Sequence, residues 1–282
     1  MSTSPVSLTT IDLIARAIAE DLAGGEDVTS VSTVDATQRA VAHFVARKEG
    51  VIAGLDVARA TLTFLGILQV ELLVNDGDFV SAGTEILRAS GLTRNLLLAE
   101  RTALNFLGHL SGIATLTRTW VDAVDGFTTQ IRDTRKTTPG LRELEKYAVR
   151  MGGGTNHRMS LSESALIKDN HIEAAGSVTE AFKRVRNSFP NIDIEIEVDT
   201  LQQLSEILEY QPDLVLLDNM TPVQCGQAVE IVAGRCKLEA SGGISLENAK
   251  AYAASGVDYI AIGALTHSAP VLDIGLDLKA EI

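Results

Sequence analysis

Residues 192–200 read IDIEIEVDT, and this stretch decides between two folds. Its acidic side chains stand at every second position: Asp193, Glu195, Glu197 and Asp199. Because the side chains of a strand point alternately to opposite faces, the pattern predicts a strand with one apolar and one acidic face. Strands of an open doubly wound sheet are usually apolar on both faces. The stretch therefore favours an α/β barrel whose interior carries polar residues. An edge strand with a solvated acidic face is the alternative.

Strands and helices alternate on both sides of this stretch. The candidate strands are 129–133, 165–169, 192–198, 213–217, 237–240 and 258–262. The candidate helices are 141–151, 178–189, 201–210, 222–233 and 246–254. Such alternation predicts a parallel sheet with helices between its strands.

The chain has a different pattern before residue 113. Apolar spacing predicts a helix over 11–22 and strands over 41–46 and 68–74, and residues 75–91 have the turn–strand–turn pattern of a small β structure. Residues 93–124 form a long apolar helical region, which we expect to break around Gly108 to Gly112.

Composition excludes several classes of protein. The chain carries 24 Lys and Arg against 37 Asp and Glu, and only 4% of its residues are aromatic, which argues against a nucleic-acid-binding surface. The N-terminus has no basic n-region, and no apolar run reaches the length of about 20 residues of a membrane span. Cys225 and Cys236 fit no metal-ligand spacing, so we expect inert thiols. A cytoplasmic enzyme is the expectation.

The charge balance reverses locally. Between Arg132 and Asp169 there are eight Lys and Arg and five Asp and Glu, a net charge of +3 in a chain of net charge −13. Cations gathered among Gly, Ser and Thr indicate a site for a small anion. Within this segment Arg142, Lys146 and Arg150 have helical spacing, and we expect a solvated face that pairs with Glu143 and Glu145.

Polar residues or glycine follow every candidate strand of the second half. Active residues of parallel α/β folds cluster at these carboxyl ends. The residues found there are Arg132, Asp133, Arg135 and Lys136; Lys168, Asp169 and Asn170; Glu197 and Asp199; Asp218 and Asn219; Ser241, Gly242 and Gly243; and Gly263 and Ala264.

Two of these ends have the composition of a phosphate cradle. Ser241 to Gly243, followed by the expected N-cap Ser245, and Gly263 to Ala264 each place glycine before a helix start. Glycine allows the backbone to approach closely, and a helix start offers free N–H groups. Glycine used only for turn geometry is the alternative.

Opposite charges complete the predicted site. Glu197 and Asp218 offer hard oxygen ligands for Mg²⁺ or could stabilise a developing cation; a structural ion pair with a lysine is the alternative. Arg135, Lys136, His157, Arg158 and Lys168 form a basic group that suits a ligand with two carboxylates.

The chain resembles the quinolinate phosphoribosyltransferase family over nearly its whole length. The motifs that carry the resemblance are EDLAGGEDVTS (20–30), ARKEGVIAG (46–54), ERTALNFLGHLSGIAT (100–115), DTRKTTPGLRELEKYAVRMGGGTNHR (133–158), ALIKDNHI (165–172), EIEVDT (195–200), LLDNM (216–220), EASGGI (239–244) and IAIGALTHS (260–268). The block at 133–158 is highly specific.

The resemblance implies an N-terminal α/β sandwich domain (1–113), an incomplete, open α/β barrel of about six strands (114–267) and a C-terminal segment (268–282) that packs back on the first domain. It implies transfer of the phosphoribosyl group of phosphoribosyl pyrophosphate to quinolinate, giving nicotinate mononucleotide, pyrophosphate and CO₂ in de novo NAD biosynthesis, with Mg²⁺. It also implies a homodimer, or a larger assembly of dimers.

The resemblance also assigns roles to residues. Arg135, His157, Arg158 and Lys168 would hold the quinolinate carboxylates, beside Thr134, and Arg101 would come from the partner subunit. Lys136, Glu197 and Asp218 would be catalytic: Lys136 near the departing carboxylate or the pyrophosphate, and the two acids at the ribose and at Mg²⁺, directly or through water. Ser241, Gly242, Gly243, Gly263 and Ala264 would bind the 5′-phosphate.

Two alternatives of other kinds stay open at this point. One is a sister phosphoribosyltransferase that acts on nicotinate, nicotinamide or another base, against which the density of basic residues argues. The other is a non-catalytic anion-binding protein, against which the presence of both Glu197 and Asp218 argues.

Overall fold

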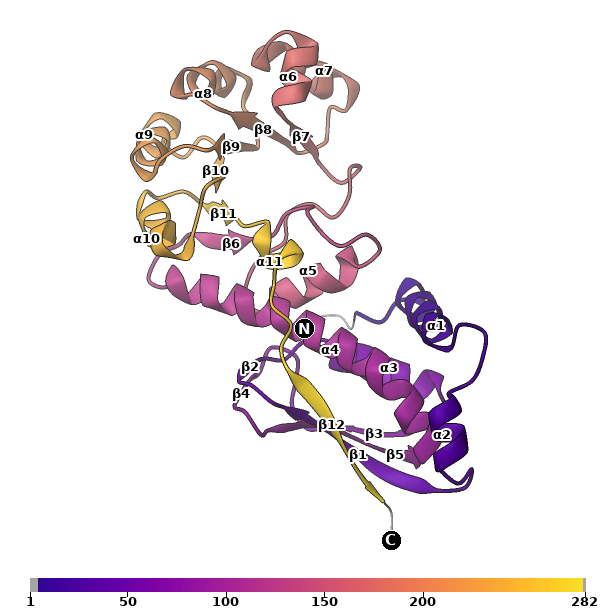
Figure 1. Ribbon diagram of the computed structural model, residues 1–282. Helices are drawn as coiled ribbons and strands as arrows, with labels where there is room; N and C mark the ends of the chain where they lie inside the picture. The colour runs from indigo at the N-terminus through magenta and orange to yellow at the C-terminus, as the bar shows by residue number, and fades with distance from the viewer. Residues whose placement is uncertain (1–4, 281–282) are drawn as a thin grey trace. The chain divides into compact units, whose positions relative to one another are not determined.

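The computed structural model describes residues 5–280, which form two compact units (Figure 1). The first unit comprises the described residues up to Leu116, Glu143–Gly153 and the chain from Ser268 onward. The second comprises Thr117–Arg142 and Gly154–His267.

The first unit is built on an antiparallel sheet of four strands in the order β12-β1-β5-β3. The strands are β1 (Arg39–Ala46), β3 (Gln69–Leu72), β5 (Glu85–Leu92) and β12 (Ile274–Ala280), and a separate pair joins β2 (Gly50–Val51) to β4 (Phe79–Val80). In β1 every second residue is buried, so that Ala40, Ala42 and Phe44 face the core. The helices of this part are α1 (Leu8–Leu22), α2 (Val28–Thr33), α3 (Leu55–Phe64) and α5 (Arg142–Met151), together with α4 (Thr93–Ala123), whose residues from Thr117 onward belong to the second unit.

The prediction that the long helix breaks around Gly108 to Gly112 is wrong. α4 runs without interruption through Gly108 and Gly112. A Cβ at Gly112 would lie 2.1 Å from the carbonyl oxygen of Pro270, and one at Gly108 would lie 3.0 Å from that of Leu272. These glycines therefore allow close approach of the returning C-terminal chain and do not end the helix.

The prediction that α5 has a solvated face is also wrong for the middle turn of the helix. Glu145 and Lys146 are both fully buried, and Glu145 Oε1 lies 2.9 Å from Nε2 of His109. The hydroxyl of Tyr147 donates a 2.7 Å hydrogen bond to Asp76, which also accepts the N–H groups of Gly54 and Leu55 at the start of α3. Because of these contacts Glu143–Gly153 belongs to the first unit, whereas the sequence places it with the barrel.

The second unit is an open α/β barrel, as predicted. Six parallel strands have the order β6-β11-β10-β9-β8-β7, and among the described residues no pairing joins β6 to β7. They are β6 (Gln130–Arg132), β7 (Ala165–Ile167), β8 (Ile194–Val198), β9 (Leu214–Asp218), β10 (Lys237–Ser241) and β11 (Tyr259–Ala261). β8 lies between β7 and β9, so the edge-strand alternative is wrong.

Helices follow the strands, and the larger ones lie along the outer side of the sheet (Figure 1). They are α6 (Asp169–Ala175), α7 (Val178–Ser188), α8 (Leu201–Ile207) with the 3₁₀ turn η1 (Leu208–Tyr210), α9 (Pro222–Val232), α10 (Leu246–Ala254) and α11 (Ala264–His267). Reciprocal capping at Thr200 and Gln203, and at Thr221 and Gln224, begins α8 and α9. α6 and α11 are too short to show helical periodicity, which is why the sequence does not predict them.

Within residues 5–280, no helix has the length and apolar character needed to cross a membrane.

Candidate functional site

A pocket of about 440 Å³ opens at the carboxyl ends of the barrel strands. It is lined by Thr134, Arg135, Lys136, His157, Arg158, Leu166, Lys168, Asp169, Glu197, Leu216, Asp218, Glu239, Ser241 and Ala261. Most of the residues singled out from the sequence thus come together from five of the six strands and from the loop after α5.

Backbone hydrogen bonds fix the loop after β6. The N–H of Lys136 donates to Thr134 Oγ1 over 3.0 Å, and Thr266 Oγ1 donates to the carbonyl of Lys136 over 2.8 Å. Asp133, fully buried, accepts the N–H of His157 over 2.8 Å. The two loops that carry the basic residues are therefore tied together beneath the pocket.

The basic side of the pocket favours an anion. Burial lowers the pKa of Arg158, and the nearby guanidinium of Arg135 lowers it further. Nη1 of Arg158 donates to the carbonyl of Ser164 over 2.6 Å, which fixes the direction of the side chain. Two guanidinium groups held close together repel each other, so an anionic ligand between them would be stabilised by both.

The acidic side favours a cation. Burial raises the pKa of Glu197, and the charge of Asp218 raises it further. Burial likewise raises the pKa of Asp218, followed by the charges of Asp199 and Asp169. Carboxylates that repel one another in a half-buried place gain from a nearby metal ion or a developing positive charge.

The two candidate phosphate loops lie at the ends of β10 and β11. Ser241 lines the pocket, and Gly242 and Gly243 follow it with φ of 86° and 64°, values that favour glycine. Gly263 packs against the Lys136 side chain, where a Cβ would lie 2.9 Å from Cδ. Gly242, Gly243, Gly263 and Ala264 are not among the pocket-lining residues, and Arg101 is an exposed residue of α4 in the first unit.

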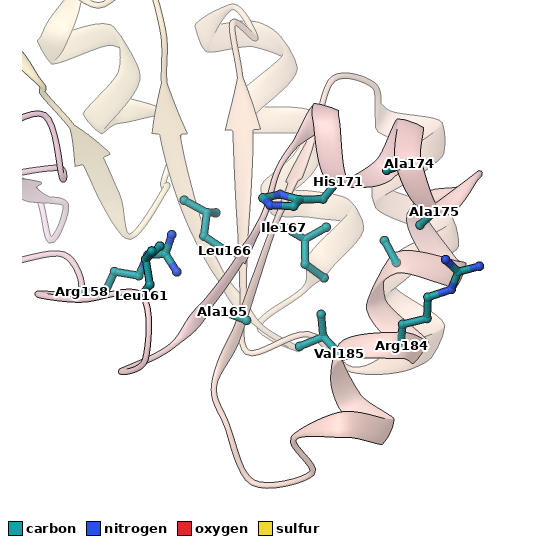
Figure 2. A pocket seen from close by; sticks show the side chains of 11 residues that line it. Arg158, Leu161, Ala165, Leu166, Ile167, His171, Ala174, Ala175, Arg184 and Val185 are labelled. Atoms are coloured by element: carbon teal, nitrogen blue, oxygen red, sulfur yellow. The ribbon is translucent and has the colours of Figure 1, made fainter.

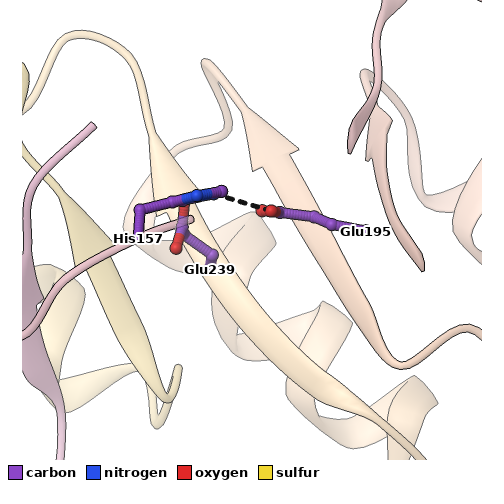
Figure 3. Close-up of side chains that lie close together, drawn as sticks. All are labelled: His157, Glu195 and Glu239. Atoms are coloured by element: carbon purple, nitrogen blue, oxygen red, sulfur yellow. Dashed lines mark ion pairs between the residues drawn. The ribbon is translucent and has the colours of Figure 1, made fainter. Parts of the chain in front are cut away.

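The sequence does not predict a buried cluster of His157, Glu195 and Glu239, of which His157 and Glu239 line the pocket. His157 Nε2 lies 2.7 Å from Glu195 Oε2 and 3.8 Å from Glu239 Oε1, and the three side chains point toward one another from β8, β10 and the loop after α5 (Figure 3). Nη1 of Arg132 donates to Glu239 Oε2 over 2.9 Å. Glu239 is the residue that sequence reasoning missed; its signal is a single acid inside the buried strand KLEAS.

A proton, and not a metal ion, fits between His157 and Glu195. Ligand atoms that share a zinc ion at about 2.0 to 2.2 Å stand more than 3 Å apart in tetrahedral geometry. A separation of 2.7 Å is that of a hydrogen bond. Burial raises the pKa of both Glu195 and Glu239 to about 7.

A second pocket of about 420 Å³ lies where β7 meets α6 and α7 (Figure 2). Its walls are mostly aliphatic, with Leu166, Ile167 and Val185 among them, and it shares only Arg158 and Leu166 with the charged pocket. It lacks the paired carboxylates, so the charged pocket is the candidate active site.

Comparison with known proteins agrees with this site. Residues 27–111 match the quinolinate phosphoribosyl transferase N-terminal domain, and residues 113–277 match the C-terminal domain. The chain is 52% identical to the nicotinate-nucleotide pyrophosphorylase (carboxylating) of Mycobacterium leprae over 95% of this chain and 96% of the relative.

Solved structures give the same result. The crystal structure of NadC from Streptococcus pyogenes superposes with a TM-score of 0.95 at 38% identity, covering 100% of both chains. That of nicotinate-nucleotide pyrophosphorylase from Ehrlichia chaffeensis gives 0.92 at 39% identity, covering 97% of this chain and 99% of the other. The chain belongs to the quinolinate phosphoribosyltransferase family.

Proposed function

We propose that the charged pocket of the second unit carries out the family's reaction. The protein transfers the phosphoribosyl group of phosphoribosyl pyrophosphate to quinolinate and gives nicotinate mononucleotide, pyrophosphate and CO₂, a step of de novo NAD biosynthesis. The observation that carries the proposal is that two charge sets line one cavity: the guanidinium and ammonium groups of Arg135, Lys136, Arg158 and Lys168, and the carboxylates of Glu197 and Asp218.

The basic side would select a dicarboxylate. Arg135, Arg158 and Lys168 supply the fork-shaped and point donors that two carboxylates of one ring require. Nicotinate carries one carboxylate, so it would leave a half-buried guanidinium without its anion. An unmade charged hydrogen bond of this kind costs about 1.5 to 3 kcal/mol, which is a discrimination of roughly ten- to a hundredfold.

The opposite side would hold phosphoribosyl pyrophosphate. Ser241 to Gly243 and Gly263 to Ala264 would bind the 5′-phosphate through backbone N–H groups near helix starts. Glu197 and Asp218 would face the ribose. These two carboxylates also fit Mg²⁺, because their oxygens are hard donors and because burial, followed by neighbouring carboxylates, raises their pKa values, so that a nearby cation would stabilise their charged forms. Mg²⁺, when bound there directly or through water, supplies positive charge for the departing pyrophosphate.

The chain's residues have separate tasks in the reaction. The pyridine nitrogen of quinolinate forms a bond to C1 of the ribose as the bond from C1 to pyrophosphate oxygen breaks. Glu197 and Asp218 would stabilise the positive charge that develops on the ribose. The ring nitrogen is then quaternary, and its positive charge stabilises the electron pair that stays on the neighbouring ring carbon when the carboxylate of that carbon departs as CO₂. Lys136 would lie near that carboxylate or the pyrophosphate, and a proton replaces the CO₂ on the ring carbon.

The assembly would be a homodimer, or a larger assembly of dimers, with Arg101 contributed to the partner's site. Arg101 is exposed, and its Nη2 lies 4.0 Å from Oε1 of Glu100, so its guanidinium is available to an anion. A cytoplasmic location agrees with Cys225 and Cys236, which are free thiols whose pKa burial raises to about 11.

Turnover with purified protein tests the function. Quinolinate, phosphoribosyl pyrophosphate and Mg²⁺ should give nicotinate mononucleotide and CO₂ in equal amounts, and a parallel reaction with nicotinate should form nucleotide at least about tenfold more slowly. Turnover of nicotinate at a rate equal to that of quinolinate or faster, or of neither, would move the function to a sister phosphoribosyltransferase or to a non-catalytic anion-binding protein.

A further inference from the structure

We propose that His157 is a positioning residue, which Glu195, Glu239 and Arg132 hold from below and which in turn fixes Arg158. The family resemblance implies that His157 holds a quinolinate carboxylate; in this assignment its imidazole instead donates no hydrogen bond to the substrate, and the two buried glutamates serve quinolinate binding through His157. The proposal rests on the proposed function and assigns roles to Glu195, Glu239 and Arg132 within it.

Both ring nitrogens of His157 have partners inside the protein. The backbone N–H of Arg158 donates to Nδ1 over 2.7 Å, so Nδ1 carries no proton. A neutral imidazole with a bare Nδ1 must carry its proton on Nε2. Nε2 lies 2.7 Å from Glu195 Oε2, to which that proton is donated. No ring N–H is left for a ligand in the pocket.

The groups that support the ring are acidic and basic side chains. Glu195 and Glu239 are both buried, on β8 and β10 (Figure 3). Glu195 is within hydrogen-bond distance of His157, whereas Glu239 Oε1 lies beside Nε2 at 3.8 Å without a hydrogen bond to it. Arg132 donates to Glu239 over 2.9 Å, and its guanidinium lies 4.3 Å from the centre of the Tyr259 ring. The second strand-borne carboxylate is thus itself held in place, and His157 cannot turn without giving up a hydrogen bond at each nitrogen.

The backbone at His157 is fixed as well. The backbone N–H of His157 donates to the fully buried Asp133 over 2.8 Å. The backbone N–H of the next residue, Arg158, donates to the imidazole ring. The direction in which the Arg158 side chain extends from the backbone is therefore fixed, and its Nη1 donates a hydrogen bond to the carbonyl of Ser164. The barrel strands thus hold the imidazole of His157, and the imidazole in turn holds the backbone of Arg158, whose guanidinium faces the pocket. Preorganising that guanidinium avoids the cost of ordering it when the ligand binds.

The state of the ring gives the first test. The chain has five histidines, so ¹⁵N-labelled histidine gives few signals, and loss of one in His157→Gln identifies the ring. We expect a bare Nδ1 and a protonated Nε2, unchanged when quinolinate is added. A ring protonated at both nitrogens, or at Nδ1, in the presence of quinolinate would overturn the proposal. This measurement needs no turnover, so it can be read even if the proposed function fails.

Kinetics give the second test. Glu195→Gln keeps an oxygen that can accept the proton of Nε2, whereas Glu195→Ala removes it. We expect Glu195→Ala to raise the KM for quinolinate about tenfold or more, with the KM for phosphoribosyl pyrophosphate within about twofold, and Glu195→Gln to restore most of the loss. Ile196→Ala, buried on the opposite face of the same strand, is the control for general destabilisation and should leave the KM for quinolinate unchanged.

Two kinetic outcomes would overturn the assignment. One is an unchanged KM for quinolinate in Glu195→Ala. The other is an equal rise in Glu195→Ala and Ile196→Ala, because a merely structural role predicts that result. If the wild-type protein does not use quinolinate at all, the proposed function fails, and the ring protonation alone decides the position of the proton on His157.

Discussion

Asn219 Nδ2 donates a 2.7 Å hydrogen bond to Oδ2 of Asp218. The residue has a positive φ of 53°, its backbone N–H donates to the carbonyl of Ser241 over 2.9 Å, and its side chain fills the space that a Cβ on Gly242 would need. One side chain thus links the proposed ribose carboxylate to the proposed phosphate loop.

We therefore expect Asn219→Ala to raise the KM for phosphoribosyl pyrophosphate by about tenfold, because the loss of one hydrogen bond to a charged group costs about 1.5 kcal/mol or more. Asn219→Gly loses the same bond but adopts positive φ freely, so it should keep more thermal stability than the alanine variant. An unchanged KM in both variants would show that Asp218 needs no such support.

Arg158→Ala should abolish most use of quinolinate while the fold survives. The change removes a half-buried guanidinium that we assign to a substrate carboxylate, and we expect kcat/KM to fall by about a hundredfold or more. Arg184→Ala is the control, because Arg184 forms an exposed pair with Glu180 on α7 and does not line the charged pocket. Values of kcat/KM near wild type in Arg158→Ala would contradict the assignment.

Mixed subunits test the role of Arg101. If each site takes Arg101 from one chain and Arg158 from the other, Arg101→Ala and Arg158→Ala are inactive alone but complement each other in a hybrid. Random exchange in an equal mixture would leave about a quarter of the sites intact, since half of the symmetric dimers are hybrids with one complete site. Activity that stays at the level of the separate variants would contradict a shared site.

The pH dependence of stability tests the buried carboxyl of Glu239. Burial, followed by the charge of Glu195, raises its pKa from 4.5 to about 7, while His157 and Arg132 act in the opposite direction. A carboxyl whose pKa is higher in the folded state contributes stability that is fully present below about pH 4.5 and is lost as the pH rises through 7.

Glu239→Gln keeps this carboxyl neutral at every pH. The unfolding free energy of the variant relative to wild type should therefore increase between pH 4.5 and 7.5, by about 3 kcal/mol at most. Urea titrations across this range measure it, with Glu206→Gln on the exposed side of α8 as the control for the substitution. A difference that is constant, or that falls with pH, would contradict the raised pKa.

Two helical glycines give a matched test of the fold. Gly112→Ala should destabilise the protein by several kcal/mol, because the new Cβ would lie 2.1 Å from a backbone oxygen of the returning chain. Gly226→Ala, in α9 with nothing within 4 Å of its Cβ position, should stabilise by about 0.5 to 1 kcal/mol. Thermal unfolding compares the two, and equal melting temperatures would contradict the contact at Gly112.

Local patterns were enough to predict most of the barrel. Alternation of polarity identified β8 and its acidic inner face, and the strand ends brought Arg135, Lys168 and Glu197 to one pocket. These predictions succeed because period-two patterning and the meeting of parallel strand ends depend only on spacing along the chain.

Features that depend on distant contacts were not predictable from spacing. The sequence predicts a helix break at Gly112 because the contact of Gly112 with Pro270 is not visible in the local pattern. It predicts a solvated Lys146 because the burial of that side chain in the first unit depends on distant contacts. The partnership of Glu239 with His157 and Arg132 joins residues that lie 82 and 107 positions apart in the chain, so no local pattern reveals it.

The most direct measurement uses quinolinate labelled with carbon-14 at one carboxyl or the other, incubated with the protein, phosphoribosyl pyrophosphate and Mg²⁺. Label in the carboxyl beside the ring nitrogen should leave as CO₂ in equal amount to the pyrophosphate formed, and label in the other carboxyl should stay in nicotinate mononucleotide. Retention of both labels, or CO₂ without nucleotide, would contradict a carboxylating-type phosphoribosyl transfer in this pocket.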